Sequence, residues 1–193
     1  MERLIKVDAS DDVPALHRGT PVERFLGYHN FGLPFDRYTA PELLVGMCMD
    51  NRKMLRLPDN FAVILRTGGA NMRQSEFKIS YAVAVSGVQA IVLVAHTQCG
   101  MVNLTARREQ FIRGLVERAG WERDWAAQHF DSFAPLFEIG NEVDFVLSEA
   151  RRLRSRYRGI PVIPTLYRVE DNRIYLLRED APIQEGGHDH ASQ

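Results

Sequence analysis

Three short runs of consecutive apolar residues predict buried strands in this 193-residue chain. They are Leu43–Cys48, Phe61–Leu65 and Ala90–Ala95, and a fourth strand is predicted at Ile160–Tyr167. Runs that are apolar on both faces are typical of parallel strands that helices cover on each side. The order strand, loop, strand, helix, strand therefore indicates a parallel sheet with crossover connections.

Apolar positions three and four residues apart predict five helical segments between and around these strands. The segments are Val22–Tyr28, Ser75–Ser86, Thr105–Ala119, Trp121–Phe137 and Asn141–Arg158. Pro21 suits the first position of the first helix, whereas Pro135 is expected to interrupt the fourth. The expected core-facing stripe of the second helix is Phe77, Tyr81, Ala84, Val85 and Val88.

The predicted fold class is α/β, with a central, mostly parallel sheet of four strands, an antiparallel edge strand and flanking helices. The turn Glu170–Arg173 is expected to connect the fourth strand to Ile174–Leu177 as a hairpin. Ile174–Leu177 is therefore predicted to be the antiparallel strand at the edge of the sheet.

Composition excludes several classes of partner. The chain is 45% hydrophobic and 25% charged, which is ordinary for a globular protein. A formal net charge of -1 gives no attraction to nucleic acid or to an anionic membrane, so neither is expected. The N-terminus lacks a secretory pattern, and no apolar run is long enough to span a bilayer. We therefore expect a cytoplasmic protein with reduced cysteines, which disfavours a disulfide between Cys48 and Cys99.

The two cysteines lie in two short motifs at the carboxyl ends of predicted strands. These motifs are Cys48-Met-Asp50-Asn-Arg52 and His96-Thr-Gln-Cys99-Gly100. Ligands gather outside the carboxyl ends of parallel strands, and two thiolates with one imidazole are a donor set that zinc prefers. Three protein ligands leave a fourth position for water or substrate, which is typical of catalytic zinc. Two inert buried cysteines are the structural alternative.

Asp50 and Arg52 extend the first motif with a spacing of two residues. In an extended segment, residues 48, 50 and 52 point to the same side. The Asp50 carboxylate could bind zinc or accept a hydrogen bond from a zinc-bound water, and Arg52 would hold this carboxylate ionised. An ordinary salt bridge within a loop is the alternative interpretation.

The paired motifs resemble those of the β-class carbonic anhydrases, particularly the small microbial type. The segment Arg66-Thr-Gly-Gly-Ala is similar to that family's Arg-Asn-Ala-Gly segment, and the likeness covers roughly residues 43 to 178. Thr67, Gly68, Ala95 and Gln98 depart from the residues that are usual in the family. These positions line the pocket, so they bear on substrate identity and leave the zinc ligands intact.

The resemblance implies a zinc enzyme that hydrates carbon dioxide reversibly to bicarbonate by metal-bound hydroxide. It implies Zn²⁺ held by Cys48, His96 and Cys99, with Asp50 and Arg52 as the catalytic dyad. The Gly69 backbone N–H is expected to contact the substrate, because a glycine lets the main chain approach closely. The resemblance also implies a homodimer or a larger assembly of dimers.

Two alternatives stay open at this point. One is a hydrolase of carbonyl sulfide or carbon disulfide on the same scaffold, since these molecules are linear like carbon dioxide. The other is a non-catalytic relative in which zinc is structural and Asp50 is its fourth ligand.

The expected domain organisation follows from these assignments. Residues 1–40, with weak periodicity, are predicted to be an arm that packs on a partner subunit. Residues 41–180 are predicted to form a single α/β zinc-binding catalytic domain. Residues 181–193 are predicted to be a flexible tail, and no role is assigned to His188 or His190.

Overall fold

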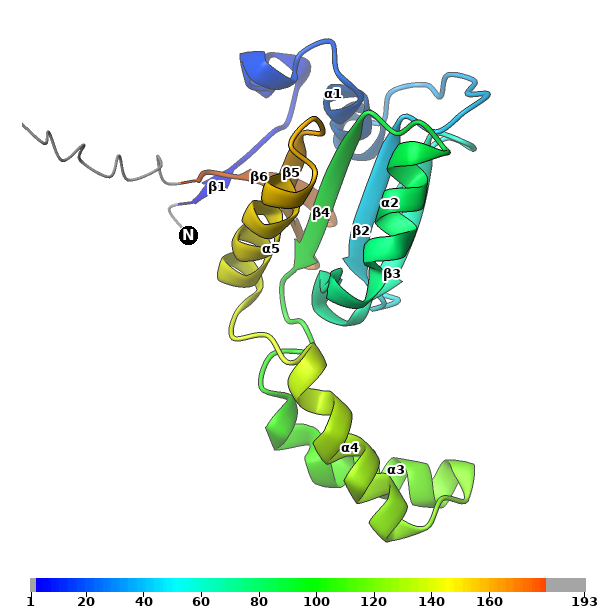
Figure 1. Cartoon of the computed structure of the whole chain (residues 1–193). Coiled ribbons are helices and arrows are strands. Elements are labelled where there is room, and N and C mark those ends of the chain that lie inside the picture. Colours follow the sequence, from blue (N-terminus) through cyan, green and yellow to red (C-terminus); the bar gives the residue numbers. More distant parts are fainter. Residues whose placement is uncertain (1–2, 180–193) are drawn as a thin grey trace, which may run out of the picture.

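A computed structural model describes residues 3–179 and contains a single six-stranded sheet (Figure 1). The strands are β1 (Leu4–Ile5), β2 (Leu43–Cys48), β3 (Ala62–Thr67), β4 (Ala90–His96), β5 (Val162–Arg168) and β6 (Arg173–Leu177). Their spatial order is β1-β6-β5-β4-β2-β3. Strands β3, β2, β4 and β5 are parallel, and β6 is antiparallel to β5. The predicted α/β fold class with four parallel strands is confirmed.

The prediction of the edge strand needs one correction. Strand β6 does not end the sheet, because β1 pairs with it in antiparallel register, with Leu4 opposite Leu177. A strand of two residues is too short to show an alternating apolar pattern, so the sequence did not reveal it.

Five α-helices connect and cover these strands: α1 (Pro21–Leu26), α2 (Glu76–Ala84), α3 (Arg108–Ala119), α4 (Arg123–Phe137) and α5 (Glu142–Arg156). Helix α1 starts with Pro21, as predicted, and the Thr20 side chain accepts a hydrogen bond from the Val22 amide. The predicted interruption at Pro135 is wrong, since α4 continues to Phe137. Pro135 lies in the last turn of α4, so the helical hydrogen bond that its missing N–H removes affects only the end of the helix.

The sheet is buried on both faces. On one face, Val45 and Val92 pack against residues of the N-terminal segment, among them Phe25 and Tyr28. On the other face, Leu44, Ile91 and Leu93 pack against α2 and α5. The N-terminal segment therefore contributes to the core of its own chain. Its contact with a partner subunit and the domain limits stay predictions, and the tail with His188 and His190 lies outside the described residues.

Four of the five residues predicted to face the core from the second helix are exposed, and the fifth, Val88, is buried just after α2 ends. Phe77, Tyr81 and Val85 are 82%, 54% and 65% exposed, whereas Ile79 and Ala82 are buried against the sheet. The helix has apolar residues on two sides, and the side with more apolar residues was predicted to face the core. The sheet instead contacts the other side, which contains Ile79 and Ala82. The path of the chain between β3 and β4 decides which side meets the sheet.

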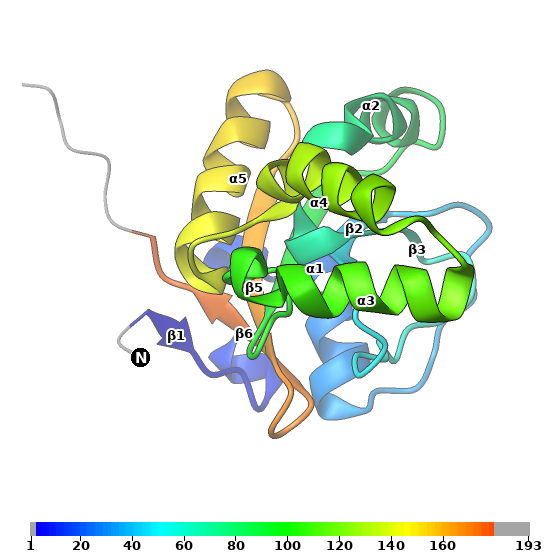
Figure 2. The same ribbon diagram turned by 90° about the horizontal axis from the view of Figure 1, so that it is seen from below.

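Helices α3 and α4 lie beyond the carboxyl ends of the parallel strands, away from the main body of the sheet (Figures 1 and 2). Arg108 of α3 binds both carboxylate oxygens of Asp131 of α4, at 2.8 and 2.7 Å. An isolated bridge between Val102 and Ile139 joins the start and the end of this helical pair. Among the described residues, no helix is both long and apolar enough to cross a membrane.

Candidate metal centre

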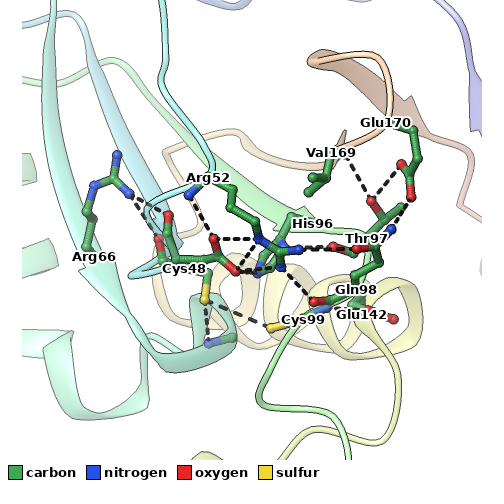
Figure 3. A network of polar contacts seen from close by, with 12 residues as sticks. Cys48, Arg52, Arg66, His96, Thr97, Gln98, Cys99, Glu142, Val169 and Glu170 are labelled. Atoms are coloured by element: carbon green, nitrogen blue, oxygen red, sulfur yellow. Dashed lines mark hydrogen bonds and ion pairs between the residues drawn. The ribbon is translucent and has the colours of Figure 1, made fainter.

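Two adjacent parallel strands bring the two sequence motifs together. Strands β2 and β4 pair directly, with Met47 opposite Val94, and Cys48 and His96 are their last residues. Cys99 follows in the turn after β4. Figure 3 shows Cys48, His96 and Cys99 converging from these two segments.

The three potential ligand atoms form a compact, buried cluster. Sγ of Cys48 lies 3.9 Å from Sγ of Cys99. These two sulfurs and a ring nitrogen of His96 all lie within 4.8 Å of one another. The residues are only 2%, 6% and 1% exposed, respectively, and both cysteines are free thiols. Cys48, Cys99 and His96 therefore form a preassembled set of soft and imidazole donors.

The orientation of the His96 ring fits a metal ligand. Nδ1 lies 2.9 Å from the backbone carbonyl oxygen of Thr97, which fixes the proton on Nδ1 and leaves a lone pair on Nε2. Nε2 is buried and has no hydrogen-bond partner within residues 3–179. Tetrahedral zinc with Zn–S bonds of about 2.3 Å places two sulfurs about 3.8 Å apart. The 3.9 Å separation of the sulfurs and the unpartnered Nε2 atom both match the requirements of this ion.

The contact between the two sulfurs shifts the pKa values of the two thiols in opposite directions. The contact with Cys99 lowers the pKa of the Cys48 thiol to about 3. The same contact, together with burial, raises the pKa of Cys99. A lowered pKa favours a thiolate at Cys48, and a thiolate attracts a cation.

Asp50 is oriented by Arg52 at the edge of this cluster. The Arg52 backbone N–H donates to Oδ1 of Asp50 at 2.9 Å, and Nη2 of the guanidinium donates to Oδ2 at 2.7 Å. These contacts with Arg52 hold the pKa of the Asp50 carboxyl well below its usual range. Oδ2 lies 4.0 Å from Nε2 of His96. An ionised carboxylate therefore stands beside the three donor atoms in a fixed orientation.

Gln98 connects this aspartate–arginine pair to the end of the sheet (Figure 3). Arg52 donates to the Gln98 side-chain oxygen at 3.2 Å and to its backbone oxygen at 2.9 Å. The Gln98 amide in turn donates to Glu170 at 3.0 Å, and Thr97 donates to the same carboxylate. Gln98 has a positive φ of 58°, so the turn itself presents both oxygens to Arg52. Gln98 thus supports the Asp50–Arg52 pair.

Arg66 shapes the loop that carries Asp50. Its guanidinium donates to the backbone oxygens of Cys48, Asp50 and Lys53, at 3.3, 3.3 and 3.2 Å. Lys53 is 1% exposed, and its Nζ has no hydrogen-bond partner in the described part of the chain. Burial lowers the pKa of the Lys53 ammonium, and the negative charges of Cys48 and Asp50 oppose this shift. A buried cation therefore lies beside the acidic donor set.

Gly69 and Glu142 fix the two cysteines from opposite sides. The Gly69 N–H contacts Sγ of Cys48 at 3.4 Å, and the backbone N–H of Cys99 donates to Glu142 at 3.0 Å. The predicted contact of the Gly69 N–H with substrate stays a prediction, and the structure gives this N–H a sulfur partner. Gly69 has a φ of 61°, which favours glycine at this position.

Sequence reasoning assigned no role to Glu142, Arg66 or Lys53, and it connected Gln98 with substrate identity and not with support of Arg52. Arg66 and Gln98 lie inside the segments that resemble those of the carbonic anhydrases. Their positions could therefore have indicated that they are close to the site. Glu142 is 43 residues from its partner Cys99, and its contact depends on how α5 packs. Lys53 follows Arg52 directly, and nothing in the sequence shows that its side chain is buried.

A cleft of 750 Å³ opens above the cluster. Cys48, Asp50, Arg52, Gln98 and Arg107 are among its lining residues. The cleft gives a small molecule a path from solvent to the cysteine and aspartate side chains, so the arrangement suits chemistry on a substrate.

Comparison with known proteins points to carbonic anhydrases. A family model described as carbonic anhydrase matches residues 59–135, which include His96 and Cys99. A β-carbonic anhydrase from Trichomonas vaginalis superposes with a TM-score of 0.60 at 16% identity, covering 78% of this chain and 91% of that one. This chain therefore resembles carbonic anhydrases in sequence over residues 59–135 and shares the fold of the β class.

Two further solved structures share the β-carbonic anhydrase fold with this chain. A carbonic anhydrase from Glaciozyma antarctica has a TM-score of 0.58 at 18% identity, covering 86% of this chain and 99% of that one. The apo form of a carbon disulfide hydrolase has a TM-score of 0.54 at 18% identity, covering 89% and 94%. At these identities, the likeness shows the fold and leaves the reaction open. A search of curated protein sequences found no match.

Proposed function

We propose that this chain is a zinc enzyme that hydrates carbon dioxide reversibly to bicarbonate. The observation that carries the proposal is the buried Cys48–His96–Cys99 cluster, whose His96 Nε2 atom is unpartnered, beside the Asp50–Arg52 pair. The match to the carbonic anhydrase family model and the β-class fold support it.

Cys48, His96 and Cys99 would hold the zinc ion. When bound, zinc supplies a Lewis acid that lowers the pKa of water to about 7, so that a nucleophile is available at neutral pH. The turn carbonyl of Thr97 keeps the Nε2 lone pair of His96 free for this role. Gly69 and Glu142 keep the two sulfurs in place through backbone contacts.

Asp50 orients the attacking water. Its Oδ2 atom accepts a hydrogen bond from the water and so directs an oxygen lone pair at the substrate carbon. Arg52 occupies both carboxylate oxygens from one side, which prevents the Asp50 side chain from rotating. Because its pKa is held low, Asp50 stays an acceptor throughout the neutral range.

The intact Asp50–Arg52 pair favours an enzyme over a structural zinc site. For Asp50 to become a fourth ligand, its carboxylate would have to give up several of these contacts with Arg52, including the 2.7 Å bond. Loss of a charge-assisted pair of this kind has an energetic cost that the described arrangement avoids. The non-catalytic alternative is therefore less well supported.

Hydrolysis of carbonyl sulfide or carbon disulfide is the second candidate function. An apolar pocket that adjoins the cleft favours it, because sulfur-containing linear molecules are larger and less polar than carbon dioxide. The same three donor residues and the same Asp50 would serve either reaction.

We further propose that the chain works as a homodimer or as an assembly of dimers. Large apolar side chains stay exposed on α2, where Phe77 is 82% exposed and Val85 is 65% exposed. Contiguous exposed apolar residues often mark a protein–protein contact. The α2 stripe, defined as Phe77, Tyr81 and Val85, is the proposed contact with the partner.

Parallel activity measurements on zinc-loaded protein test the enzymatic proposal. We expect stopped-flow measurements to show rapid hydration of carbon dioxide, and sulfide release from carbonyl sulfide would instead favour the second function. Full zinc occupancy without activity in either assay would refute both and favour the structural role.

A further inference from the structure

A pocket of 280 Å³ lies between α3, α4 and the carboxyl end of the sheet. Figure 2 shows the two helices side by side over this end of the molecule. The lining is mainly aromatic and aliphatic, with Met101, Phe111, Phe133 and Phe137 among its residues. His129 is the one lining residue with a titratable side chain. Such a surface favours uncharged molecules, because an ion would lose hydration without gaining a polar partner.

The pocket adjoins the site cleft. Met49 and Met101 line both the pocket and the cleft that contains Cys48 and Asp50. Gly68, which also lines the pocket, directly precedes Gly69, whose N–H contacts Sγ of Cys48. A Cβ atom at Gly68 would lie 3.0 Å from the Met101 sulfur and 3.3 Å from Phe137. Because residue 68 has no side chain, the pocket wall beside the Met101 sulfur and Phe137 stays open.

The cleft on the other side of these methionines has the opposite chemistry. Asp50, Arg52, Gln98 and Arg107 line it. Arg52 is already bound to Asp50 and Gln98, whereas Arg107 has no hydrogen-bond or ion-pair partner within residues 3–179. A free guanidinium at a cleft wall is suited to an anion.

We propose that the pocket between α3 and α4 receives the neutral, linear substrate, and that Arg107 in the cleft holds the anionic product. The identity of the two ligands rests on the proposed function, in which uncharged carbon dioxide and water give the bicarbonate anion and a proton. Neutral and charged species would thus occupy different walls of one site, on either side of Met49 and Met101.

The dimensions of the pocket favour a small molecule over a protein segment. A water molecule takes about 30 Å³ of liquid volume, so 280 Å³ exceeds the needs of one triatomic molecule and admits the larger sulfur compounds. An α-helix with side chains is about 10 Å across and would not fit.

Xenon binding to crystals of the zinc-loaded protein tests the pocket without turnover, because xenon occupies dry apolar cavities. We expect xenon beside Met101 and Phe133 in the wild type, and its loss in Ala134→Leu, which fills the lining from α4. Ala127→Leu places the same side chain on α4 outside the pocket lining and should keep the xenon. Absence of xenon from the wild-type pocket, or its occupation by a side chain of a second copy, would overturn the proposal.

Kinetics test the division between neutral and anionic ligands. In an apolar pocket, one methylene changes discrimination by about tenfold or more, so Ala134→Leu should lower kcat/KM for the neutral substrate by at least about tenfold. The inhibition constant of the Ala134→Leu variant for nitrate should equal that of the wild type. Arg107→Gln should weaken nitrate inhibition about two- to fivefold, as expected for one partly solvated charge, and keep the xenon site. Equal effects of both variants on nitrate and xenon would refute the division.

These measurements separate the inference from the proposed function. Xenon and nitrate binding do not require turnover, so an inactive protein with both sites intact would contradict only the enzymatic proposal. An active enzyme without a xenon site would contradict only the pocket.

Discussion

Arg52 donates hydrogen bonds to both carboxylate oxygens of Asp50, from its backbone amide and from its guanidinium. This pair stands 4.0 Å from Nε2 of His96, so it can orient a water molecule without being a ligand itself. The Asp50 carboxylate is therefore the group whose charge should matter most to turnover.

We expect Asp50→Asn to keep the zinc and to lower kcat by about 10²- to 10⁴-fold, because a neutral amide orients the attacking water poorly. Stopped-flow kinetics and metal analysis on the same sample measure both quantities. Asp59→Asn changes an exposed carboxylate on the same loop and should leave kcat unchanged. Unaltered turnover in Asp50→Asn would remove this residue from the mechanism.

The wild-type protein should contain about one zinc ion per chain, and Cys48→Ser should lose most of it, because a hydroxyl replaces a thiolate ligand. Elemental analysis after dialysis measures the ratio. The matched control is Met49→Ser, which changes the adjacent, 63% exposed side chain and should retain the metal. Full zinc content in the Cys48→Ser variant would show that the ligand assignment is wrong.

Glu142 accepts a hydrogen bond from the backbone amide of the Cys99 ligand. Loss of such a supporting group typically weakens metal binding by about 10- to 100-fold, so Glu142→Ala should lower zinc affinity by this factor. Competition with a chelator gives the affinity. Asp144→Ala removes another acidic residue from the first turn of α5, and it should have little effect if Glu142 acts through Cys99.

Lys53 predicts a pH dependence of stability in the metal-free protein. Burial lowers its pKa below the ordinary value of 10.5, so the unfolded state binds more protons between the folded pKa and 10.5. The free energy of unfolding of the wild type, relative to that of Lys53→Met, should therefore rise with pH between the folded pKa of Lys53 and 10.5. It should be lowest at pH values below the folded pKa.

Urea denaturation of both proteins at several pH values measures this difference. We expect Lys53→Met to be more stable than the wild type at neutral pH and the gap to shrink as the pH approaches 10.5. Lys78→Met changes an exposed lysine on α2 and should show no such trend. A gap that stays constant with pH would show that the Lys53 charge carries no burial cost.

The exposed α2 stripe predicts the behaviour of the oligomer. Phe77→Glu should shift a dimer toward monomer, because a charge would be buried in the contact. Light scattering over a range of concentrations measures the mass. A monomeric wild type would contradict the proposed dimer, and an unaffected dimer in Phe77→Glu would place the contact elsewhere. Lys78→Glu, at the neighbouring exposed position, is the control.

The predicted strands and most helices agree with the structure because their signals are local. Three of the four parallel strands are apolar runs buried on both faces, and α5 has a clear apolar stripe with Val146, Leu147 and Ala150 in the core. The stripe of α2 was assigned to the wrong side, since a helix with two apolar sides does not encode which one meets the sheet. Strand β1 was missed because a strand of two residues is too short to show an alternating pattern of apolar and polar residues.

The sequence by itself determined the donor types, Cys48, His96 and Cys99, and their places at the ends of strands, because motif spacing and strand periodicity are properties of neighbouring residues. Only the tertiary structure decided that β2 and β4 are adjacent, that Nε2 of His96 is left without a partner, and that Gln98 and Glu142 support the site. These relationships join residues about 40 to 50 positions apart, and they arise from how the strands and α5 pack. The apolar pocket beside the site likewise arises because α3 and α4 pack against each other beyond the carboxyl ends of the strands.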